Sequence, residues 1–438
     1  MNVEILTIGD ELLLGSTVDT NTSFLGRELA ALGVTVVRHT TCGDDVGVIV
    51  QTLREALDHT GAVITTGGLG PTADDMSVEA VARLFGRDLV RDESIARWLE
   101  DRWRGFQRKG PMPQSNYKQA MIPVGAEIIA NPVGSAPGVF VADERGRWVA
   151  TLPGVPREAR AMFTESLRPR IAALAGSATV IRSATLRTSG VSESSIADRL
   201  GEIGKGFNGL SLAFLPGAAG VDLRLTSRGL SAAEADAALA EGCRILREQV
   251  GDSIYGENDV SLAAVVLDLC RAAAMRIAVA ESCTGGMLGA HITDVPGASD
   301  VFHGGIISYD NRVKRQLLGV LDTDLSGHGA VSEPVALQMA RGVRLRLGTE
   351  IGVSITGIAG PGGGTPDKPV GTVWVGLDVS EGRPPIPRPD GYPPITPDAK
   401  ARVFHFAGNR DEIRYRAAQA ALDMIRRTVL DLHKLPAI

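Results

Sequence analysis

The chain has 438 residues, of which 44% are hydrophobic and 22% are charged, and it contains 52 glycines. This length is too great for one ordinary core, so the composition predicts a soluble globular protein of two or three domains. A formal net charge of -6 argues against a chain built mainly to coat nucleic acid and favours small-molecule substrates.

Targeting, redox and membrane signals point to the cytoplasm. The four cysteines, Cys42, Cys243, Cys270 and Cys283, have no spacing typical of a zinc site and indicate a reducing compartment. Glu4 and Asp10 interrupt the first apolar stretch, which therefore resembles a strand more than a signal peptide. No apolar run reaches the roughly 20 residues of a membrane span, so no membrane partner is expected.

Strands and helices alternate from the N-terminus. Strands are predicted at residues 3–9, 35–41 and 62–66, and a helix at 20–33 opens with Asp19 or Thr20 as its cap and closes at Gly33. A second helix follows from apolar residues at helical spacing: Val46, Ile49, Val50, Leu53 and Leu57. Such alternation predicts a parallel sheet wrapped by helices.

The remaining chain divides into a small module and a second alternating domain. The predicted fold class is α/β, with two three-layer α/β domains at 1–170 and 259–438 joined by a small α+β module at 171–258. In the last domain, the proline-rich stretch 381–400 is predicted to be an exposed surface loop between two strands.

The segment after the strand at 62–66 is typical of a phosphate site. Gly67, Gly68 and Gly70 let the backbone approach a ligand, Pro71 stiffens the turn, and Thr72 with Asp75 resembles a capping box. Asp74 and Asp75 are predicted in the first turn of a helix, where one could cap and the other could reach a divalent metal; the alternative is that both only stabilise the helix dipole. Other strand-end candidates for this pocket are Asp10, Glu11, Asn116, Lys118, Gly154 and Glu158.

The segment AVAESCTGG at 278–286 carries two candidate nucleophiles at the end of a predicted buried strand. Ser282 and Cys283 precede a tight turn through Thr284, Gly285 and Gly286 into a helix. Amide groups of such a turn can stabilise a phosphate or a developing oxyanion, so acyl transfer is indicated. The alternative is a purely structural strand-to-helix turn.

Together, these motifs resemble a known family. GDELLLG, TGGLGPTADD, NYKQA and LPGVPRE look like the molybdopterin-binding domain that opens the CinA (competence/damage-inducible) proteins, and AESCTGG onward looks like their C-terminal domain. The middle segment resembles the family's KH-like module. Its Gly201, Gly204 and Lys205 match a GxxG clamp for RNA, but a linker and dimer contact is favoured over nucleic-acid binding.

For the C-terminal domain, the resemblance implies an amidohydrolase that converts nicotinamide mononucleotide (NMN) to nicotinic acid mononucleotide and ammonia without a cofactor. Ser282 matches the nucleophile, and Tyr309 and Lys314 match the activating pair, with the lysine pKa lowered by partial burial beside Arg312 or Arg315. Thr356, Gly357, Gly360 and Arg410 are implied at the substrate. The alternatives are Lys314 as a solvated cation, Asn409 or Asp411 as a simple helix cap, and Cys283 as nucleophile with His291 or His303 as its base.

For the N-terminal domain, the resemblance implies hydrolysis of ADP-ribose to AMP and ribose 5-phosphate. A divalent metal of unknown identity would be held by Asp74 and Asp75, and the turn from Gly67 to Thr72 would hold the pyrophosphate. The alternatives are plain binding of molybdopterin at the same turn, or a protein that binds competence or recombination machinery. The resemblance also implies a homodimer.

Overall fold

The computed structural model describes residues 1–105, 110–176, 179–218, 220–380 and 399–433. These residues form two compact units, one of Met1–Arg182 with Ser227–Ala237 and one of Ser183–Thr226 with Ala238–Ile438. The α/β fold class with a small α+β module is confirmed. The domain limits at 170 and 258 remain predictions.

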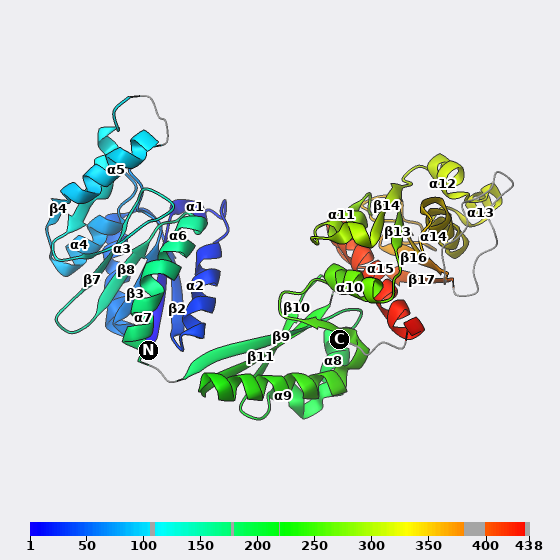
Figure 1. The fold of residues 1–438 in the computed structure, drawn as a ribbon, viewed down its shortest axis with the longest axis horizontal. Helices are drawn as coiled ribbons and strands as arrows, with labels where there is room; N and C mark the ends of the chain where they lie inside the picture. The colour runs from blue at the N-terminus through cyan, green and yellow to red at the C-terminus, as the bar shows by residue number, and fades with distance from the viewer. Residues whose placement is uncertain (106–109, 177–178, 219, 381–398, 434–438) are drawn as a thin grey trace. The chain divides into compact units, whose positions relative to one another are not determined.

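The N-terminal domain is built on a six-stranded sheet (Figure 1). Its strands lie in the order β2 (Thr35–Cys42), β1 (Asn2–Ile8), β3 (Ala62–Thr66), β8 (Trp148–Leu152), β7 (Gly138–Ala142) and β6 (Glu127–Ile129). The first four are parallel, as predicted, but β7 is antiparallel to both of its neighbours, β8 and β6, so the prediction of a parallel sheet does not hold at this edge. The short turn between β7 and β8 explains the difference, because a parallel connection needs a long crossover.

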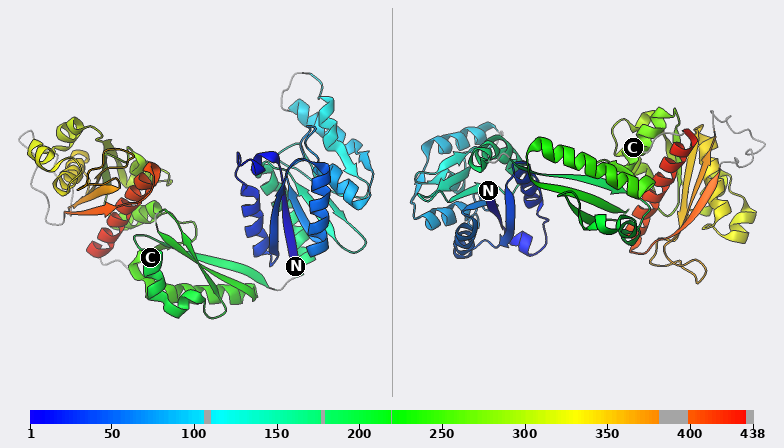
Figure 2. Two further views of the ribbon diagram at one scale, coloured as in Figure 1. Left: turned by 180° about the vertical axis from the view of Figure 1, so that it is seen from behind. Right: turned by 90° about the horizontal axis from the view of Figure 1, so that it is seen from below.

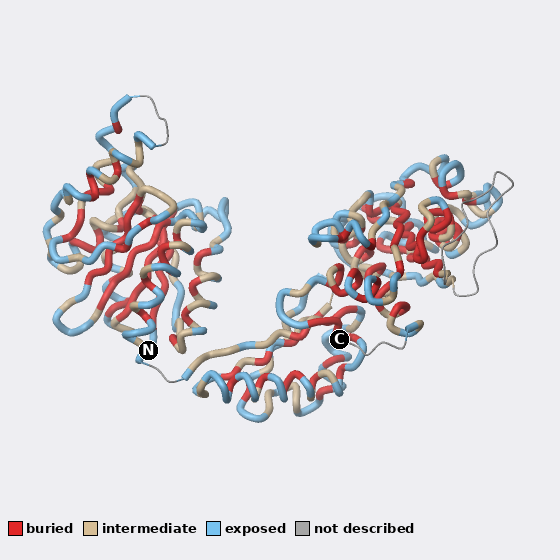
Figure 3. The backbone as a smooth tube through the Cα atoms, in the orientation of Figure 1, coloured by how far each residue is buried: buried red, intermediate tan, exposed pale blue. Residues whose placement is uncertain are grey.

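Helices cover both faces of this sheet. They are α2 (Thr20–Ala31), α3 (Val46–Thr60), α4 (Ser77–Phe85), α6 (Pro156–Met162) and α7 (Arg168–Ala175), with a π-helical stretch η2 (Phe163–Leu167) between the last two. Asp19 caps α2 by accepting a hydrogen bond from the amide of Thr22, which confirms one of the two predicted caps. The strands between these helices are largely buried (Figure 3).

A small subdomain lies at one end of the same sheet. It contains α5 (Glu93–Gly105), the 3-10 helix η1 (Gln114–Ala120) and the antiparallel ribbon of β4 (Leu89–Arg91) and β5 (Met121–Pro123). In Figures 1 and 2, α5 lies toward the same end of the sheet as α1 (Asp10–Leu13), which follows directly after β1. The subdomain is therefore at the carboxyl end of the parallel strands, where α/β sheets bind ligands.

The middle module pairs one sheet with two main helices. The strand order is β10 (Ser211–Pro216), β11 (Val221–Leu230), β9 (Val180–Thr188) and β12 (Ile254–Glu257), and helices α8 (Glu193–Leu200) and α9 (Ala232–Val250) share its apolar core. Short 3-10 helices follow each of them, η3 (Gly201–Lys205) and η4 (Gly251–Ser253). The GxxG pattern lies in η3, where the Lys205 ammonium is paired with exposed Glu202.

The C-terminal domain has three layers (Figure 2). Its sheet has the order β14 (Phe302–Ile307), β13 (Ile277–Glu281), β15 (Ile351–Gly357), β16 (Thr372–Val379) and β17 (Lys400–His405), with the last two strands antiparallel. One face packs on α10 (Leu262–Ala272), α11 (Met287–Thr293) and α15 (Arg410–His433), and the other on α14 (Glu333–Leu347). Helices α12 (Asn311–Leu318) and α13 (Asp322–His328) and the 3-10 turn η5 (Ala298–Asp300) complete it. Of the predicted proline-rich loop at 381–400, residues 381–398 lie outside the described residues.

Candidate active sites

Ser282 and Lys314 lie side by side at the carboxyl end of strand β13. The Ser282 amide donates to the Ile355 carbonyl at 2.9 Å, which fixes the residue directly after the strand. Lys314 comes from the first turn of α12 and is only 1% exposed. Its Nζ atom lies 3.1 Å from Ser282 Oγ, 2.8 Å from the Ser308 carbonyl and 3.4 Å from the Tyr309 carbonyl. The structure therefore brings the predicted nucleophile and base within hydrogen-bonding distance.

Burial lowers the pKa of Lys314, because the charged ammonium loses its hydration. Cys283 and Asp310 act on it in the opposite direction. Arg312 and Arg315, predicted to help lower this pKa, do not do so: they form ion pairs with Asp310 and Asp322. The prediction of a lowered pKa by burial is supported, its arginine cause was wrong, and the alternative of a solvated Lys314 is excluded by its burial.

The turn after the nucleophile is held by a buried carboxylate that the sequence analysis did not identify. Glu281 is 1% exposed, and its side chain accepts hydrogen bonds from the amides of Gly286 at 3.0 Å, Leu288 at 3.1 Å and Gly289 at 2.8 Å. The Gly285 amide donates to the Ser282 carbonyl. The expectation that Gly285 and Gly286 offer their amides to substrate was therefore wrong, since both groups already have internal acceptors.

The hydrogen-bond donors of this turn that remain unpaired in the described structure belong to Cys283 and Thr284. Within the described part of the chain, the amides of Cys283 and Thr284 have no acceptor, and the fully buried Thr284 hydroxyl has no hydrogen-bond partner. The Thr284 carbonyl accepts a hydrogen bond of 2.8 Å from Arg414 of α15. Arg414 was missed by the sequence analysis, although its position one helical turn after Arg410 places both on one face of the helix.

Tyr309 and Arg410 meet at the rim of the site. Tyr309 is 60% exposed, and its hydroxyl accepts a 2.9 Å hydrogen bond from Arg410, so only its backbone carbonyl reaches Lys314. Arg410 also donates to the Gly360 carbonyl at 2.5 Å. Arg410 is the first residue of α15. The side chain of Asn409 caps this helix by accepting hydrogen bonds from the amides of Asp411 and Glu412, so Asn409, and not Asp411, is the cap.

The other predicted groups of this domain have structural partners. The buried Thr356 hydroxyl donates to the Ala330 carbonyl at 2.8 Å, and a side chain at Gly357 would collide with β16. Cys283 is buried, and burial raises the pKa of its thiol to about 12, which keeps it protonated and a poor nucleophile. His303 is exposed, while the ring of His291 packs edge-on against Tyr415.

In the N-terminal domain, glycines shape the turn after β3 as predicted. A side chain at Gly67 would collide with the Ile8 carbonyl of β1, and Gly68 is closed off by Ser77 at the start of α4. The Ser77 hydroxyl donates to the Gly67 carbonyl at 2.6 Å. These contacts hold the turn rigidly against the ends of two parallel strands, where its backbone can approach a ligand.

Asp74 and Asp75 precede α4 and do not lie in its first turn, so that placement was wrong. Asp75 accepts hydrogen bonds from the amide of Thr72 at 2.8 Å and from its hydroxyl at 2.5 Å. The carboxylate-to-amide half of the predicted capping box is therefore present, and it closes a tight turn ahead of α4. Hydrogen bonding to Thr72 lowers the pKa of Asp74, and the charge of Lys118 adds to this. Lys118 donates to the Thr72 and Ala73 carbonyls.

A further carboxylate, Asp44, lies beside the predicted pair Asp10 and Glu11. Its carboxylate accepts a 3.0 Å hydrogen bond from the Asp10 amide. Burial and then the charges of Asp10, Glu11 and Asp74 raise the pKa of Asp44. Even so, no three His, Cys, Asp or Glu side chains in the described residues are arranged to hold a metal ion by themselves.

The remaining predicted strand-end residues, Gly154, Glu158 and Asn116, lie in three different surroundings. Gly154 lies against the phosphate-type turn, since a Cβ added there would be 3.5 Å from Gly67 Cα, and its carbonyl accepts from Asn21. Glu158 accepts a 2.7 Å hydrogen bond from buried Asn131 and so supports the loop before β7. Asn116 lies in η1, half-buried.

Comparison with known proteins matches three family models in succession along the chain. They are the probable molybdopterin binding domain at 4–173, the damage-inducible protein CinA KH domain at 183–256 and the CinA C-terminal domain at 259–387. Such a chain is of the three-part CinA type.

Full-length relatives give the same result. A CinA-like protein of Gemmatimonas aurantiaca is 55% identical over 98% of this chain and 96% of its own length, and one of Salinibacter ruber is 42% identical over 98% and 100%. The chain therefore belongs to the CinA family. A solved structure of CinA from Thermoplasma acidophilum, titled as of unknown function, is 38% identical over 38% of this chain and 96% of that chain, with a TM-score of 0.35.

Among the described residues, no helix has the length and apolarity required to cross a membrane.

Because Glu281 satisfies three buried amides, Glu281→Gln should destabilise the C-terminal domain. The glutamine NH2 group would face amide donors, and leaving buried donors unpaired costs about 1–3 kcal/mol. Chemical denaturation followed by circular dichroism measures the change. Glu333→Gln, at an exposed carboxylate in the first turn of α14, is the control and should have little effect. Equal stability of the two variants would show that the Glu281 hydrogen bonds do not hold the turn.

Proposed function

We propose that the C-terminal domain is a nicotinamide-nucleotide amidase, which hydrolyses NMN to nicotinic acid mononucleotide and ammonia. The observation that supports this proposal most is the 3.1 Å approach of buried Lys314 Nζ to Ser282 Oγ. Serine is a weak nucleophile at its free pKa and needs an adjacent base.

Burial favours a neutral amine at Lys314, and the three hydrogen-bond partners of Nζ can accommodate that form. A neutral amine has two N–H donors and one lone pair. Its neighbours are two backbone carbonyls, of Ser308 and Tyr309, which can only accept, and one hydroxyl, which can donate. The lone pair is therefore left for the Ser282 proton. Activity should rise with pH through the lowered pKa of Lys314, because only the deprotonated amine can act as a base.

The proposed reaction has two steps. Ser282 Oγ attacks the carboxamide carbon as its proton passes to Lys314, and the ammonium then returns that proton to the leaving nitrogen, which departs as ammonia. Water, deprotonated by Lys314, hydrolyses the resulting ester to the carboxylate and regenerates the serine. The unpaired amides of Cys283 and Thr284 are candidates for the oxyanion, and Arg410 and Arg414 supply positive charge for the nucleotide phosphate.

Replacement of Ser282 by alanine should reduce ammonia release from NMN about a thousandfold or more, because the nucleophile is lost. The assay is coupled ammonia detection on purified full-length protein without added metal. Cys283→Ala is the matched control and should keep activity within a few-fold. If Ser282→Ala is fully active and Cys283→Ala is not, the thiol is the nucleophile.

We propose that the N-terminal domain hydrolyses ADP-ribose to AMP and ribose 5-phosphate with a divalent metal. The rigid turn from Gly67 to Thr72 would hold the pyrophosphate. Carboxylates are ligands that hard cations prefer, and Asp74 would supply one of them. The ligand's phosphate oxygens would complete the coordination, and the metal would supply charge for the transition state. Asp75 is proposed to shape the turn through Thr72.

Asp74→Asn should abolish most metal-stimulated release of AMP from ADP-ribose, since it removes a charged ligand without changing side-chain size. Chromatography of the products, with and without Mg²⁺ or Mn²⁺, measures it. Glu79→Gln in the first turn of α4, whose carboxylate pairs with Arg83, is the control and should behave as the parent protein. An unchanged rate in Asp74→Asn would leave the acidic residues with a purely structural role and favour plain ligand binding.

A further inference from the structure

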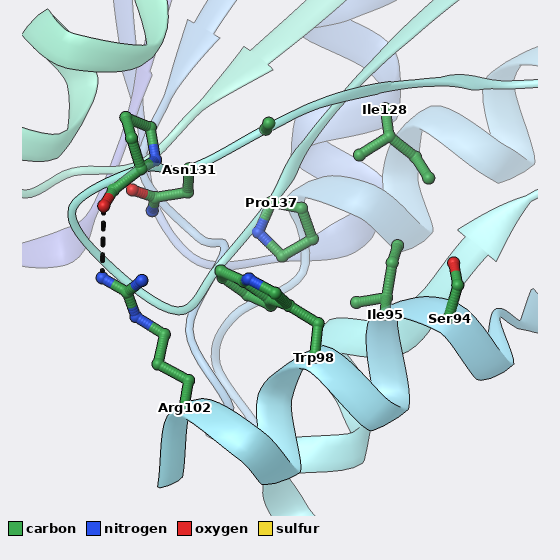
Figure 4. Close-up of a pocket in the computed structure, with 9 residues that line it drawn as sticks. Ser94, Ile95, Trp98, Arg102, Ile128, Asn131 and Pro137 are labelled. Carbon is green, nitrogen blue, oxygen red and sulfur yellow. Dashed lines mark hydrogen bonds between the residues drawn. The ribbon is translucent and has the colours of Figure 1, made fainter. Parts of the chain in front are cut away.

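A cavity of about 380 Å³ lies beside the N-terminal site, between α5 and the loop that joins β6 to β7. Figure 4 shows Ile95 and Trp98 of α5 facing Ile128 and Pro137 of the opposite wall. The volume is within the range of small-molecule pockets, which begins near 300 Å³. Ile128 is 44% exposed, so this wall presents apolar surface to solvent.

The wall formed by Trp98 is held rigidly in place. The Arg102 guanidinium lies 5.3 Å from the centre of the Trp98 ring and donates hydrogen bonds to the carbonyls of Pro132 and Val133. The guanidinium lies over the Trp98 ring, so a ligand would stack on the ring face that lines the cavity. Such a face stacks well on planar heteroaromatic rings.

The opposite wall is organised by buried Asn131. Its amide nitrogen donates to the Ala136 carbonyl and to Glu158, and its oxygen accepts from the amides of Val133 and Gly134. All four hydrogen-bonding positions of this side chain are therefore taken. A ligand in the cavity would be held by stacking and apolar contact more than by hydrogen bonds to Asn131, so one ring should be tolerated nearly as well as another.

The cavity and the proposed phosphate turn are linked through the turn between β8 and α6. Glu158, which holds Asn131, lies in the first turn of α6, four residues after Gly154. Gly154 in turn lies against Gly67. The segment from Gly154 to Glu158 therefore contacts the phosphate turn at one end and the cavity wall at the other.

We propose that this cavity binds the planar heteroaromatic ring of the phosphorylated ligand that the turn at Gly67 holds, with purine bases as the chemical class, stacked on Trp98. The proposal rests on the function proposed for the phosphate turn and adds the site that recognises the base. It assigns Glu158 a supporting role at the cavity wall.

Calorimetric titration of the full-length protein with AMP, GMP and ribose 5-phosphate tests the proposal. Trp98→Ala should weaken AMP and GMP binding about 10- to 100-fold, because stacking on one aromatic ring is lost, and should leave ribose 5-phosphate binding unchanged. Trp98→Phe should retain most of the affinity. Arg97→Ala, at an exposed neighbour on α5 that does not line the cavity, is the matched control.

A second variant protects the test against misfolding of Trp98→Ala. Ala130→Trp places a large ring in the cavity from an exposed lining position and should abolish AMP binding while the thermal denaturation midpoint is kept. Parent-like AMP affinity in both Trp98→Ala and Ala130→Trp, or no AMP binding by the parent protein, would overturn the proposal. ADP-ribose hydrolysis is measured separately. If the parent protein binds AMP in a way that depends on Trp98 but does not hydrolyse ADP-ribose, the cavity proposal stands and the hydrolase proposal fails.

Discussion

The C-terminal site depends on one buried contact, that between Lys314 and Ser282. Lysine is rarely buried without a counter-charge, because the ammonium loses its hydration in the protein interior. Here the amine is enclosed by two backbone carbonyls and one hydroxyl. Burial favours the neutral form, and in that form the Ser282 hydroxyl is the neighbour that can donate a proton to the lone pair. In the proposed reaction, burial and backbone geometry would make this amine the base for Ser282.

The rest of the nucleophile turn keeps that contact in place. Glu281 satisfies the amides at the start of α11, and Arg414 holds the Thr284 carbonyl from α15. An internal carboxylate therefore takes the position that an anionic ligand often occupies at a helix N-terminus. As a result, the groups left for a substrate lie closer to the serine, at the amides of Cys283 and Thr284.

Local patterns in the sequence predicted the parts of this structure that local forces determine. The cap at Asp19, the strand end at Ser282 and the glycine turn at Gly67 follow from hydrophobic spacing and backbone freedom. The role of Arg414 could not be predicted from local pattern, because tertiary packing brings its acceptor, the Thr284 carbonyl, near. Glu281 was missed for another reason: its partners are nearby backbone amides, which carry no side-chain signal in the sequence. The antiparallel edge of the N-terminal sheet was missed because alternating strands and helices indicate a parallel sheet, and a short hairpin at one edge leaves little trace in that alternation.

The protonation state of Lys314 in the folded enzyme tests the central claim most directly. In protein carrying ¹³C at lysine Cε, the NMR signal that disappears in Lys314→Arg can be assigned and followed against pH. The account predicts that this signal titrates below the usual pH range of lysine side chains, because burial disfavours the ammonium. A titration within that usual range, or above it, would show that Lys314 remains charged at working pH and cannot be the base for Ser282.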